Sequence, residues 1–156
     1  MRIGYLSGDF HRHATSQLAV QMFEAHDRGR FEVTLFSAGP DDGTPLRRRM
    51  QAATEHWVDL HGRALHEMAA EIRRRQVDIL VGPLSGGEGI AVKDYSKTQP
   101  QVTFINGSSG AQATTLTNPS PNFFRFNTDG GQWMAGLGAE ALKRGYKRVM
   151  IIAEDY

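Results

Sequence analysis

The sequence predicts an α/β fold: one domain of 156 residues built as a three-layer, doubly wound, mainly parallel sheet of the Rossmann or flavodoxin type. Short apolar runs rich in β-branched and aromatic residues alternate with longer stretches whose apolar residues recur every three or four positions. This alternation indicates parallel strands joined by right-handed helical crossovers. The length of the chain suits a single domain with a sizeable core.

Seven segments have the composition of strands. They span residues 2–7, 31–37, 57–60, 77–83, 101–106, 123–127 and 148–153. We expect the first five in the spatial order 3-2-1-4-5, because the first helical crossovers run one way from the first strand and the later ones run the other way. The segment 123–127 and the last strand, Arg148–Ala153, are expected near one edge.

Helices are expected between these strands, each with an apolar stripe. The stripes consist of Leu18, Met22 and Ala25; Leu65, Met68, Ala69 and Ile72; Tyr95 with Ile90 or Ala91; and Met134, Leu137 and Ala141. Capping signals mark three helix starts, at Thr44-Pro45, Ser85 to Glu88 and Asp129 to Gln132. The stretch Gly107–Asn122 has neither period and predicts a long loop with one turn of helix.

Composition excludes several classes of function. The formal net charge is +1, so a basic nucleic-acid footprint is absent, and the lack of cysteine excludes disulfides, thiol nucleophiles and cysteine-ligated zinc. The longest apolar run, Val149–Ala153, is far shorter than the roughly 20 residues that span a bilayer. We expect no nucleic-acid or membrane partner, no metal and no cofactor. A strand-like run directly after Met1 predicts no signal peptide and a cytoplasmic location.

The loop Asp9–Ser16 is the first candidate site, because ligands of doubly wound sheets bind beyond the carboxyl ends of the strands. In this loop His13 is a candidate general base, and the following helix could hold an anion at its N-terminus. The alternative is a polar loop in which Thr15 or Ser16 only caps the helix.

Two glycine-rich segments are further candidates. Gly82–Gly89 follows a strand and opens a helix, so that its amides and the Ser85 hydroxyl face a possible ligand, or form only a capping box. It has neither the dinucleotide-binding spacing nor that of a P-loop. Asn106–Thr115 has the small residues that let a backbone approach a ligand, and is otherwise a flexible loop. The arginine runs 47–49 and 73–75 are expected on helix faces or ends, where cations are favourable anyway.

Residues 2–80 resemble the O-linked N-acetylglucosamine transferases. The resemblance rests on Arg2–Phe10, Phe31-Glu32-Val33, the run Gly39–Thr44 and Val77–Leu80, whose order and spacing match the start of that family's first catalytic Rossmann domain. It implies that His13 stands at the position of a histidine proposed there as the active-site base. Gln17 stands where the animal enzymes have a second histidine.

Residues 81–156 resemble the periplasmic solute-binding proteins for branched-chain amino acids and aromatic acids. The motifs are Gly82–Gly87, Asn106–Ser109, Asn122–Arg125 and Lys147-Arg148-Val149. The resemblance implies that Ser85, Gly110 and Gln112 lie where that family holds the ligand's carboxylate and amine. A threonine is common in that family where this chain has Gln112.

The two resemblances meet at Leu80-Val81, where the composition also changes. Residues 1–80 contain 11 arginines, no lysine and all six histidines, whereas residues 81–156 contain four lysines and three arginines. We interpret the chain as an engineered chimera of the two families, with no intact activity of either and therefore not an enzyme. Alternatives are a weak binding module for an amino acid or aromatic carboxylate, and a residual glycosyltransferase. Exchange of the segment after Asn127 between two copies would give a homodimer.

Overall fold

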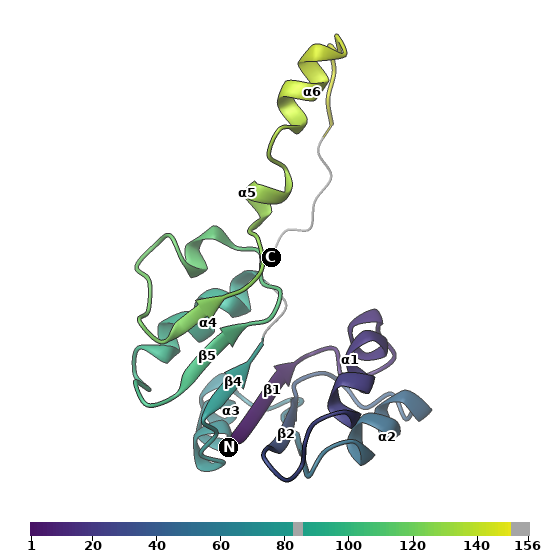
Figure 1. The fold of residues 1–156 in the computed structure, drawn as a ribbon, viewed down its shortest axis with the longest axis vertical. Coiled ribbons are helices and arrows are strands. Elements are labelled where there is room, and N and C mark those ends of the chain that lie inside the picture. The colour runs from purple at the N-terminus through teal and green to yellow at the C-terminus, as the bar shows by residue number, and fades with distance from the viewer. Residues whose placement is uncertain (83–85, 151–156) are drawn as a thin grey trace.

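The computed structural model describes residues 1–82 and 86–150 and shows one parallel sheet of six strands. The strands lie in the order β3-β2-β1-β4-β5-β6, so the first strand is central and the chain winds outward in both directions (Figure 1). This confirms the predicted α/β fold and the order of its first five strands, with the segment from Phe123 at one edge.

The strands are short, and every pair of neighbours is parallel. They comprise β1 (Arg2–Ser7), β2 (Glu32–Ser37), β3 (His56–Asp59), β4 (Ile79–Val81), β5 (Thr103–Asn106) and β6 (Phe123–Arg125). The helices are α1 (Ala14–Glu24), α2 (Pro45–Ala52), α3 (Leu65–Arg74), α4 (Gly86–Ser96), α5 (Gly130–Trp133) and α6 (Leu137–Lys143), with a 3₁₀ turn η1 at Gln112–Thr114. The turn falls inside the segment predicted as a loop with one helical turn.

Two apolar layers sandwich the sheet. On one face α1 and α2 pack on the first three strands, through residues such as Phe23, Leu35 and Met50. On the other face α3 and α4 cover Phe36, Leu80 and Phe104. Leu35 and Phe36 are adjacent in β2 and point to opposite faces, as side chains alternate along a strand. Both layers are therefore built from the runs that predicted the strands.

The predicted apolar stripe of α1 is wrong, although the helix is present. Leu18 is 83% exposed and Met22 is 44% exposed, whereas Ser16, Val20 and Phe23 are buried. Both sets have helical spacing, so periodicity alone does not choose between them. The buried face contains Ser16 because its hydroxyl donates a hydrogen bond to the carbonyl oxygen of Asp9 in the preceding loop.

Among the described residues, helices cover only one half of the sheet face that α1 and α2 occupy. The strand register places Ile79, Val81 and Ile105 on the same face as Tyr5, with Phe124 beside Ile105 on β6. Phe124 is 48% exposed, and the three aliphatic side chains are only partly buried. We call Ile79, Val81, Ile105 and Phe124 the bare half-face.

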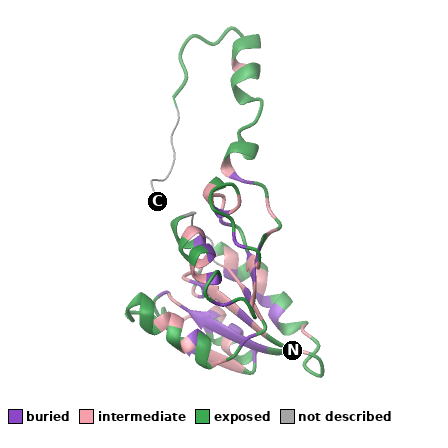
Figure 2. Cartoon of the chain, turned by 90° about the vertical axis from the view of Figure 1, so that its left-hand side faces the viewer, coloured by how far each residue is buried: buried purple, intermediate pink, exposed green. Residues whose placement is uncertain are grey.

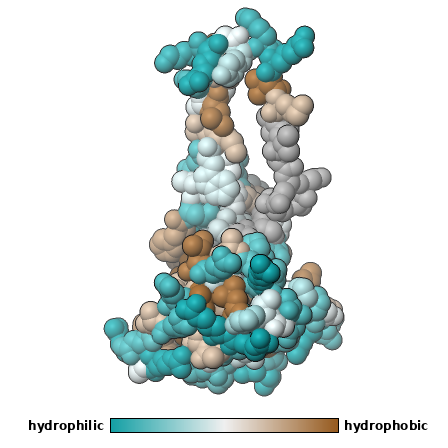
Figure 3. All heavy atoms as spheres, turned by 90° about the vertical axis from the view of Figure 1, so that its right-hand side faces the viewer, coloured by the Kyte–Doolittle hydropathy of each residue, from teal (hydrophilic) through white to brown (hydrophobic). Residues whose placement is uncertain are grey.

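Residues 130–150 form an arm that leaves the carboxyl edge of the sheet and carries α5 and α6 (Figures 1 and 2). Nearly all of the arm is exposed, including Met134, Leu137 and Leu142 from the predicted helical region, and hydrophobic side chains are visible on it (Figure 3). The predicted last strand does not form in residues 148–150, which have no neighbouring strand to pair with. The rest of that predicted strand, residues 151–153, lies outside the described residues.

Candidate functional site at the carboxyl edge of the sheet

The loops that follow the parallel strands meet at the carboxyl edge of the sheet, where doubly wound folds bind ligands. Two glycines make the close approach possible. A Cβ atom on Gly39 would overlap the carbonyl oxygen of Gly8, and one on Gly82 would overlap that of Leu6. Gly82 also has a φ of +128°, which side-chain-bearing residues rarely adopt. The loops after β1 and β2 are therefore packed backbone to backbone, and Gly82 at the end of β4 lies directly against the backbone of β1.

A buried arginine fixes two of these loops. Arg47 in the first turn of α2 is 1% exposed, and its guanidinium donates to the carbonyl oxygen of Phe10 at 3.0 Å, the hydroxyl of Ser37 at 3.0 Å and the carbonyl oxygen of Pro40 at 3.2 Å. Its Nη2 donates to the Asp59 carboxylate at 2.9 Å. The β1–α1 and β2–α2 loops and the end of β3 thus share one cation.

Further contacts hold Arg47 in place. Its guanidinium carbon lies 4.8 Å from the ring centroid of Trp57, an attractive cation–π arrangement. Its Nε lies 3.0 Å from the Asp41 carboxylate, an ion pair that lacks hydrogen-bond alignment. The sequence analysis placed this arginine in a run of favourable surface cations, so its structural role was missed. The signal available was Thr44-Pro45, which fixes the helix start and directs the third helical residue inward.

His13 is the N-cap residue of α1, a role that the sequence analysis gave to Thr15 or Ser16. The backbone N–H of Thr15 donates to His13 Nδ1 at 3.3 Å, and the Thr15 hydroxyl lies 3.1 Å from the same nitrogen. The Asp9 carboxylate is 3.8 Å from Nδ1. As a cap, Nδ1 must be an acceptor, so the neutral ring carries its proton on Nε2. In that tautomer Nε2 is a hydrogen-bond donor and cannot act as a base.

The Asp42 carboxylate ties the β2–α2 loop to the candidate site. It accepts a hydrogen bond from the backbone N–H of Arg12 at 2.6 Å and another from the N–H of Thr44 at 3.1 Å. Partial desolvation raises its pKa, but these two backbone hydrogen bonds, a further hydrogen bond from the Thr44 hydroxyl and the nearby His11 together outweigh it, so that the pKa of Asp42 lies below its ordinary value. Asp42 is therefore ionised across the physiological range.

A cavity of about 110 Å³ lies between the carboxyl ends of β1 and β4, where the direction in which successive strands are added to the sheet reverses; we call it the switch-point cavity. Tyr5, Phe10 and Thr15 line one side, and Val81 and the loop after β5 line the other. Ligand pockets usually have about 300–1,000 Å³. This cavity can therefore hold only part of a ligand as large as a sugar nucleotide.

The predicted ligand-binding residues of the second half do not converge on an open site. Gly110 and Gln112 lie at the base of the arm: Gly110 accepts a hydrogen bond from the N–H of Gly130 at 2.8 Å, and the Gln112 amide lies 3.3 Å from the Asp129 carboxylate. A Cβ on Gly110 would lie 2.9 Å from the Trp133 ring, which packs over it. Ser85, the third of these residues, lies outside the described residues.

Two cations and an amide order the long loop 107–122. Lys93, which is 3% exposed, donates to the carbonyl oxygen of Thr117 at 3.1 Å. Arg125 donates to the carbonyl oxygen of Ala111 and to the hydroxyl of Thr115. The Asn122 side chain donates to three backbone carbonyl oxygens that follow α4 or end it. The loop is hence part of the folded body.

Within residues 1–82 and 86–150, no group of three or more histidine, aspartate or glutamate residues is placed to hold a metal ion. No helix of that part of the chain is long and apolar enough to cross a membrane.

The fold and the site together define a Rossmann-type α/β domain whose candidate site is the loop cluster at the carboxyl edge. Residues 1–89 match glycosyl transferase family 41. The chain belongs to this family.

Similar proteins agree with the family match. An Arabidopsis thaliana protein named as a UDP-N-acetylglucosamine–peptide N-acetylglucosaminyltransferase, SEC, is 32% identical over 116 residues, which are 71% of this chain and 12% of that protein. A Caenorhabditis elegans UDP-N-acetylglucosamine–peptide N-acetylglucosaminyltransferase is 39% identical over 82 residues, 52% of this chain and 7% of its own length. The structure of a Thermobaculum terrenum O-GlcNAc transferase mutant superposes with a TM-score of 0.56 and 26% identity over 68% of this chain and 20% of that chain.

The chain therefore spans about a tenth of the length of these curated relatives. The transferase resemblance of the first half is confirmed. The expectation that the protein is not an enzyme is wrong, because its family and the similar proteins are glycosyltransferases. The error came from treating the second half as a replacement that abolishes activity. The solute-binding resemblance of residues 81–156 and the chimeric origin stay predictions.

Proposed function

We propose that this chain supplies part of the active site of an enzyme that transfers N-acetylglucosamine from UDP to a peptide. Membership of glycosyl transferase family 41 carries the proposal. The β1–α1 and β2–α2 loops, held by Arg47, form a rigid rim at the edge where such a donor would bind. Because the switch-point cavity holds only about 110 Å³, this portion contacts the donor without enclosing it.

In the proposed transfer, a peptide hydroxyl attacks the anomeric carbon of the sugar, the bond to the β-phosphate of UDP breaks, and a base takes the hydroxyl proton. His13 can be that base through Nε2 only if Nδ1 carries the ring proton. The partners for such an N–H are present, since the Thr15 hydroxyl lies 3.1 Å from Nδ1 and the Asp9 carboxylate 3.8 Å away. Catalysis would then require a change of tautomer that gives up the helix cap.

Nuclear magnetic resonance of the whole chain with UDP-N-acetylglucosamine tests this proposal. We expect amide shifts to change in residues 9–16 and 39–44, with a dissociation constant in the millimolar range, since only part of the donor is contacted. The variant His13→Asn keeps a good N-cap and removes the base, so it should bind the donor unchanged and lose any peptide-dependent turnover. If the donor at about 10 mM changes no shift at this edge, the proposal fails.

We propose a two-source origin for the chain, with the seam near Leu80. The family match ends at residue 89, the lysine and histidine usage changes in the same region, and the arm beyond Trp133 is exposed. The corresponding ligand would be a small amino acid or aromatic carboxylate at Gly110 and Gln112. Calorimetry with leucine and benzoate tests that ligand, and absence of heat at millimolar concentrations would remove it. The Gln112→Ala variant should reduce any heat of binding that the unmodified chain shows.

We also propose that the arm mediates association of two copies. The arm exposes Leu137, Leu142 and Tyr146, while the bare half-face of the body is apolar and no helix of the described residues packs on it. Since the arm leaves the body at the carboxyl edge and extends away from it, the two surfaces do not meet within one chain (Figure 1). Reciprocal contact between two copies would bury both, as in a closed symmetric dimer.

Light scattering at about 100 μM chain should then give the mass of a dimer. Leu142→Glu, which puts a charge on the arm, should give a monomer. The matched control is Leu116→Glu, because Leu116 is 68% exposed and lies in the loop of the body, away from the arm. A monomeric wild-type chain at this concentration would contradict the proposal.

A further inference from the structure

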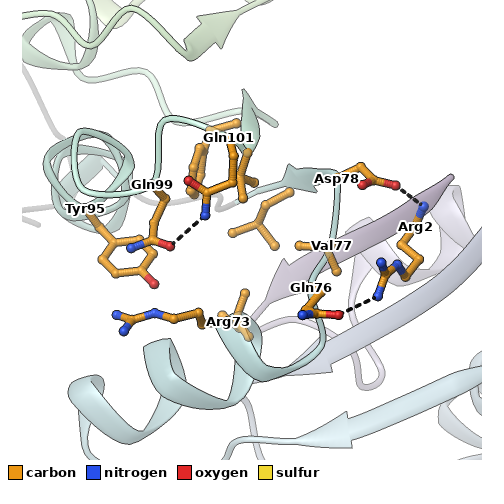
Figure 4. A pocket seen from close by; sticks show the side chains of 12 residues that line it. Arg2, Arg73, Gln76, Val77, Asp78, Tyr95, Gln99 and Gln101 are labelled. Atoms are coloured by element: carbon orange, nitrogen blue, oxygen red, sulfur yellow. Dashed lines mark hydrogen bonds between the residues drawn. The ribbon is translucent and has the colours of Figure 1, made fainter.

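A second cavity lies at the amino end of the sheet, opposite the candidate site at the carboxyl edge. It has a volume of about 450 Å³ and opens between the C-terminal ends of α3 and α4 (Figure 4). Its apolar wall is formed by Leu80 and Phe104 from the sheet, Val77 just before β4, and Ile72 from α3. A cavity of this size and lining is within the range of small-molecule sites.

One end of the cavity carries two polar groups without partners. In the run 73–75, Arg74 and Arg75 both pair with Glu71. The Arg73 guanidinium, in contrast, forms no hydrogen bond or ion pair with the described residues. The Tyr95 hydroxyl likewise has no hydrogen-bond partner among the described residues. Figure 4 shows both side chains at the same end of the cavity.

The remaining polar groups of the rim are mostly engaged with one another. The Arg2 guanidinium donates to the Gln76 side chain at 3.2 Å, and the Asp78 carboxylate accepts the backbone N–H of Arg2 at 2.7 Å. Gln101 donates to the Gln99 side-chain oxygen at 3.3 Å. With two arginines and one aspartate, the rim carries a net positive charge. The Arg73 and Tyr95 end is therefore the part of the rim where a guanidinium and a hydroxyl both lack a partner among the described residues.

We propose that this cavity is a binding site for a small planar aromatic anion, such as an aryl carboxylate. The ring would lie against the apolar wall formed by Val77, Leu80 and Phe104, where it loses contact with water. The acid group would accept hydrogen bonds from the Arg73 guanidinium and the Tyr95 hydroxyl, neither of which has a partner among the described residues. The site is separate from the β1–α1 and β2–α2 loops at the carboxyl edge, and it goes beyond the function proposed above.

A simpler role for Arg73 is to offset the negative end of the α3 dipole, since it lies in the last turn of that helix. The dipole role requires only proximity to the helix end. It does not require an adjoining apolar cavity or an unpaired tyrosine hydroxyl directed to the same place. The two roles also differ in outcome, because a dipole partner changes stability without selecting a ligand.

Titration of the whole chain with 2-naphthoate, followed by amide chemical shifts, tests the site. We expect shifts to change in residues 72–80 and 95–104 and not in residues 9–16. The neutral isostere 2-naphthamide should bind at least about tenfold more weakly, because it lacks the charge that Arg73 neutralises. No shift change in these segments with 2-naphthoate at millimolar concentration would overturn the proposal.

Matched variants separate a ligand site from a helix-end cation. Arg73→Met keeps the aliphatic stem and should weaken 2-naphthoate about tenfold, whereas Arg74→Met, one position along the same helix, should leave the affinity unchanged. Tyr95→Phe should weaken the binding of 2-naphthoate about threefold, because it removes the hydroxyl donor and keeps the ring in the cavity wall. If Arg73→Met and Arg74→Met bind 2-naphthoate equally well, Arg73 is a helix-end cation only and the site is wrong. A thermal melt of each variant confirms that the compared proteins are folded.

Discussion

Replacement of Arg47 by alanine should destabilise the whole domain, because this guanidinium joins parts of the chain that make few other polar contacts. The change removes the donor to the Phe10 carbonyl oxygen and the Ser37 hydroxyl, which belong to residues at most 3% exposed. A hydrogen bond to a charged group contributes about 1.5–3 kcal/mol, and an unsatisfied buried acceptor costs a similar amount.

The carboxylates that pair with Arg47 reduce the expected loss. The side chains of Asp41 and Asp59 are 59% and 49% exposed, so they regain water when the guanidinium is removed. Counting mainly the two buried acceptors, we expect the free energy of unfolding to fall by about 3–5 kcal/mol. Arg47→Lys keeps a charge but cannot reach all the acceptors with one ammonium group, and should lose about half as much.

Urea unfolding followed by circular dichroism measures this difference. Arg49→Ala is the control on the same helix: Arg49 is exposed and pairs with Glu24 at the surface, so its midpoint should stay within experimental error of the wild type. If Arg47→Ala lowers the midpoint no more than Arg49→Ala, Arg47 does not organise the carboxyl edge. Should Arg47→Ala fail to fold, Arg47→Lys supplies the comparison.

Three other perturbations have definite expected outcomes. Gly39→Ala should cost at least about 1–3 kcal/mol in the same unfolding assay, because its methyl group collides with the backbone of Gly8. Lys93→Met should speed amide hydrogen exchange in residues 111–117 about tenfold or more, since the loop loses its buried ammonium donor. Hydrogen bonds from the Gln132 backbone N–H and the Gln112 side chain, with the nearby Arg125, lower the pKa of Asp129 below 3.8, although partial burial opposes them. The ionised Asp129 carboxylate therefore contributes its full stability above pH 3.8, and this contribution is lost as the pH falls through the lowered pKa. Acid titration followed by the amide shifts of α5 would detect the loss.

Each of these has a matched control. Gly43→Ala also changes a glycine of the β2–α2 loop, but no atom lies near its Cβ position, so only the strain of its positive φ should appear. Lys97→Met removes a more exposed lysine of the segment after α4 and should leave exchange in the loop unaltered. Asp129→Asn keeps a cap and should abolish the acid dependence of α5. If a variant and its control change the measured stability, exchange rate or acid dependence equally, the contact proposed for that residue is wrong.

Strand positions could be predicted from the sequence because each strand is a run with a single interpretation. The run Arg2–Ser7 was predicted with the bounds that the structure shows, and the β4 and β5 segments were predicted two residues too long at their amino ends. The extra residues, 77–78 and 101–102, are turn, bend or irregular positions that precede strand pairing, and the turn residue Gln76 just before the first of them has a φ of +52°. Local propensity does not contain that information, because the first paired residue depends on the neighbouring strand.

The sequence predicts the location of the candidate site but not the arrangement of its side chains. The β1–α1 loop was placed correctly because topology alone puts it at the carboxyl edge. The sequence does not show that His13 caps its own helix, since the choice between capping and proton transfer depends on distances of a few tenths of an ångström. Arg47 was missed for a similar reason: a run of three arginines gives no sign that one of them is 1% exposed.

The central place of β1 affects how the chain is made. As synthesis proceeds, β1 can pair with β2 once the chain has emerged as far as Ser37, but its other edge stays open until β4 at Ile79–Val81 is available. For that interval the nascent chain presents an unpaired apolar strand edge, the kind of surface that recruits other strands. Translational pausing between residues 40 and 80 would lengthen the exposure. Ribosome-associated chaperones should bind the emerging polypeptide most strongly in that window.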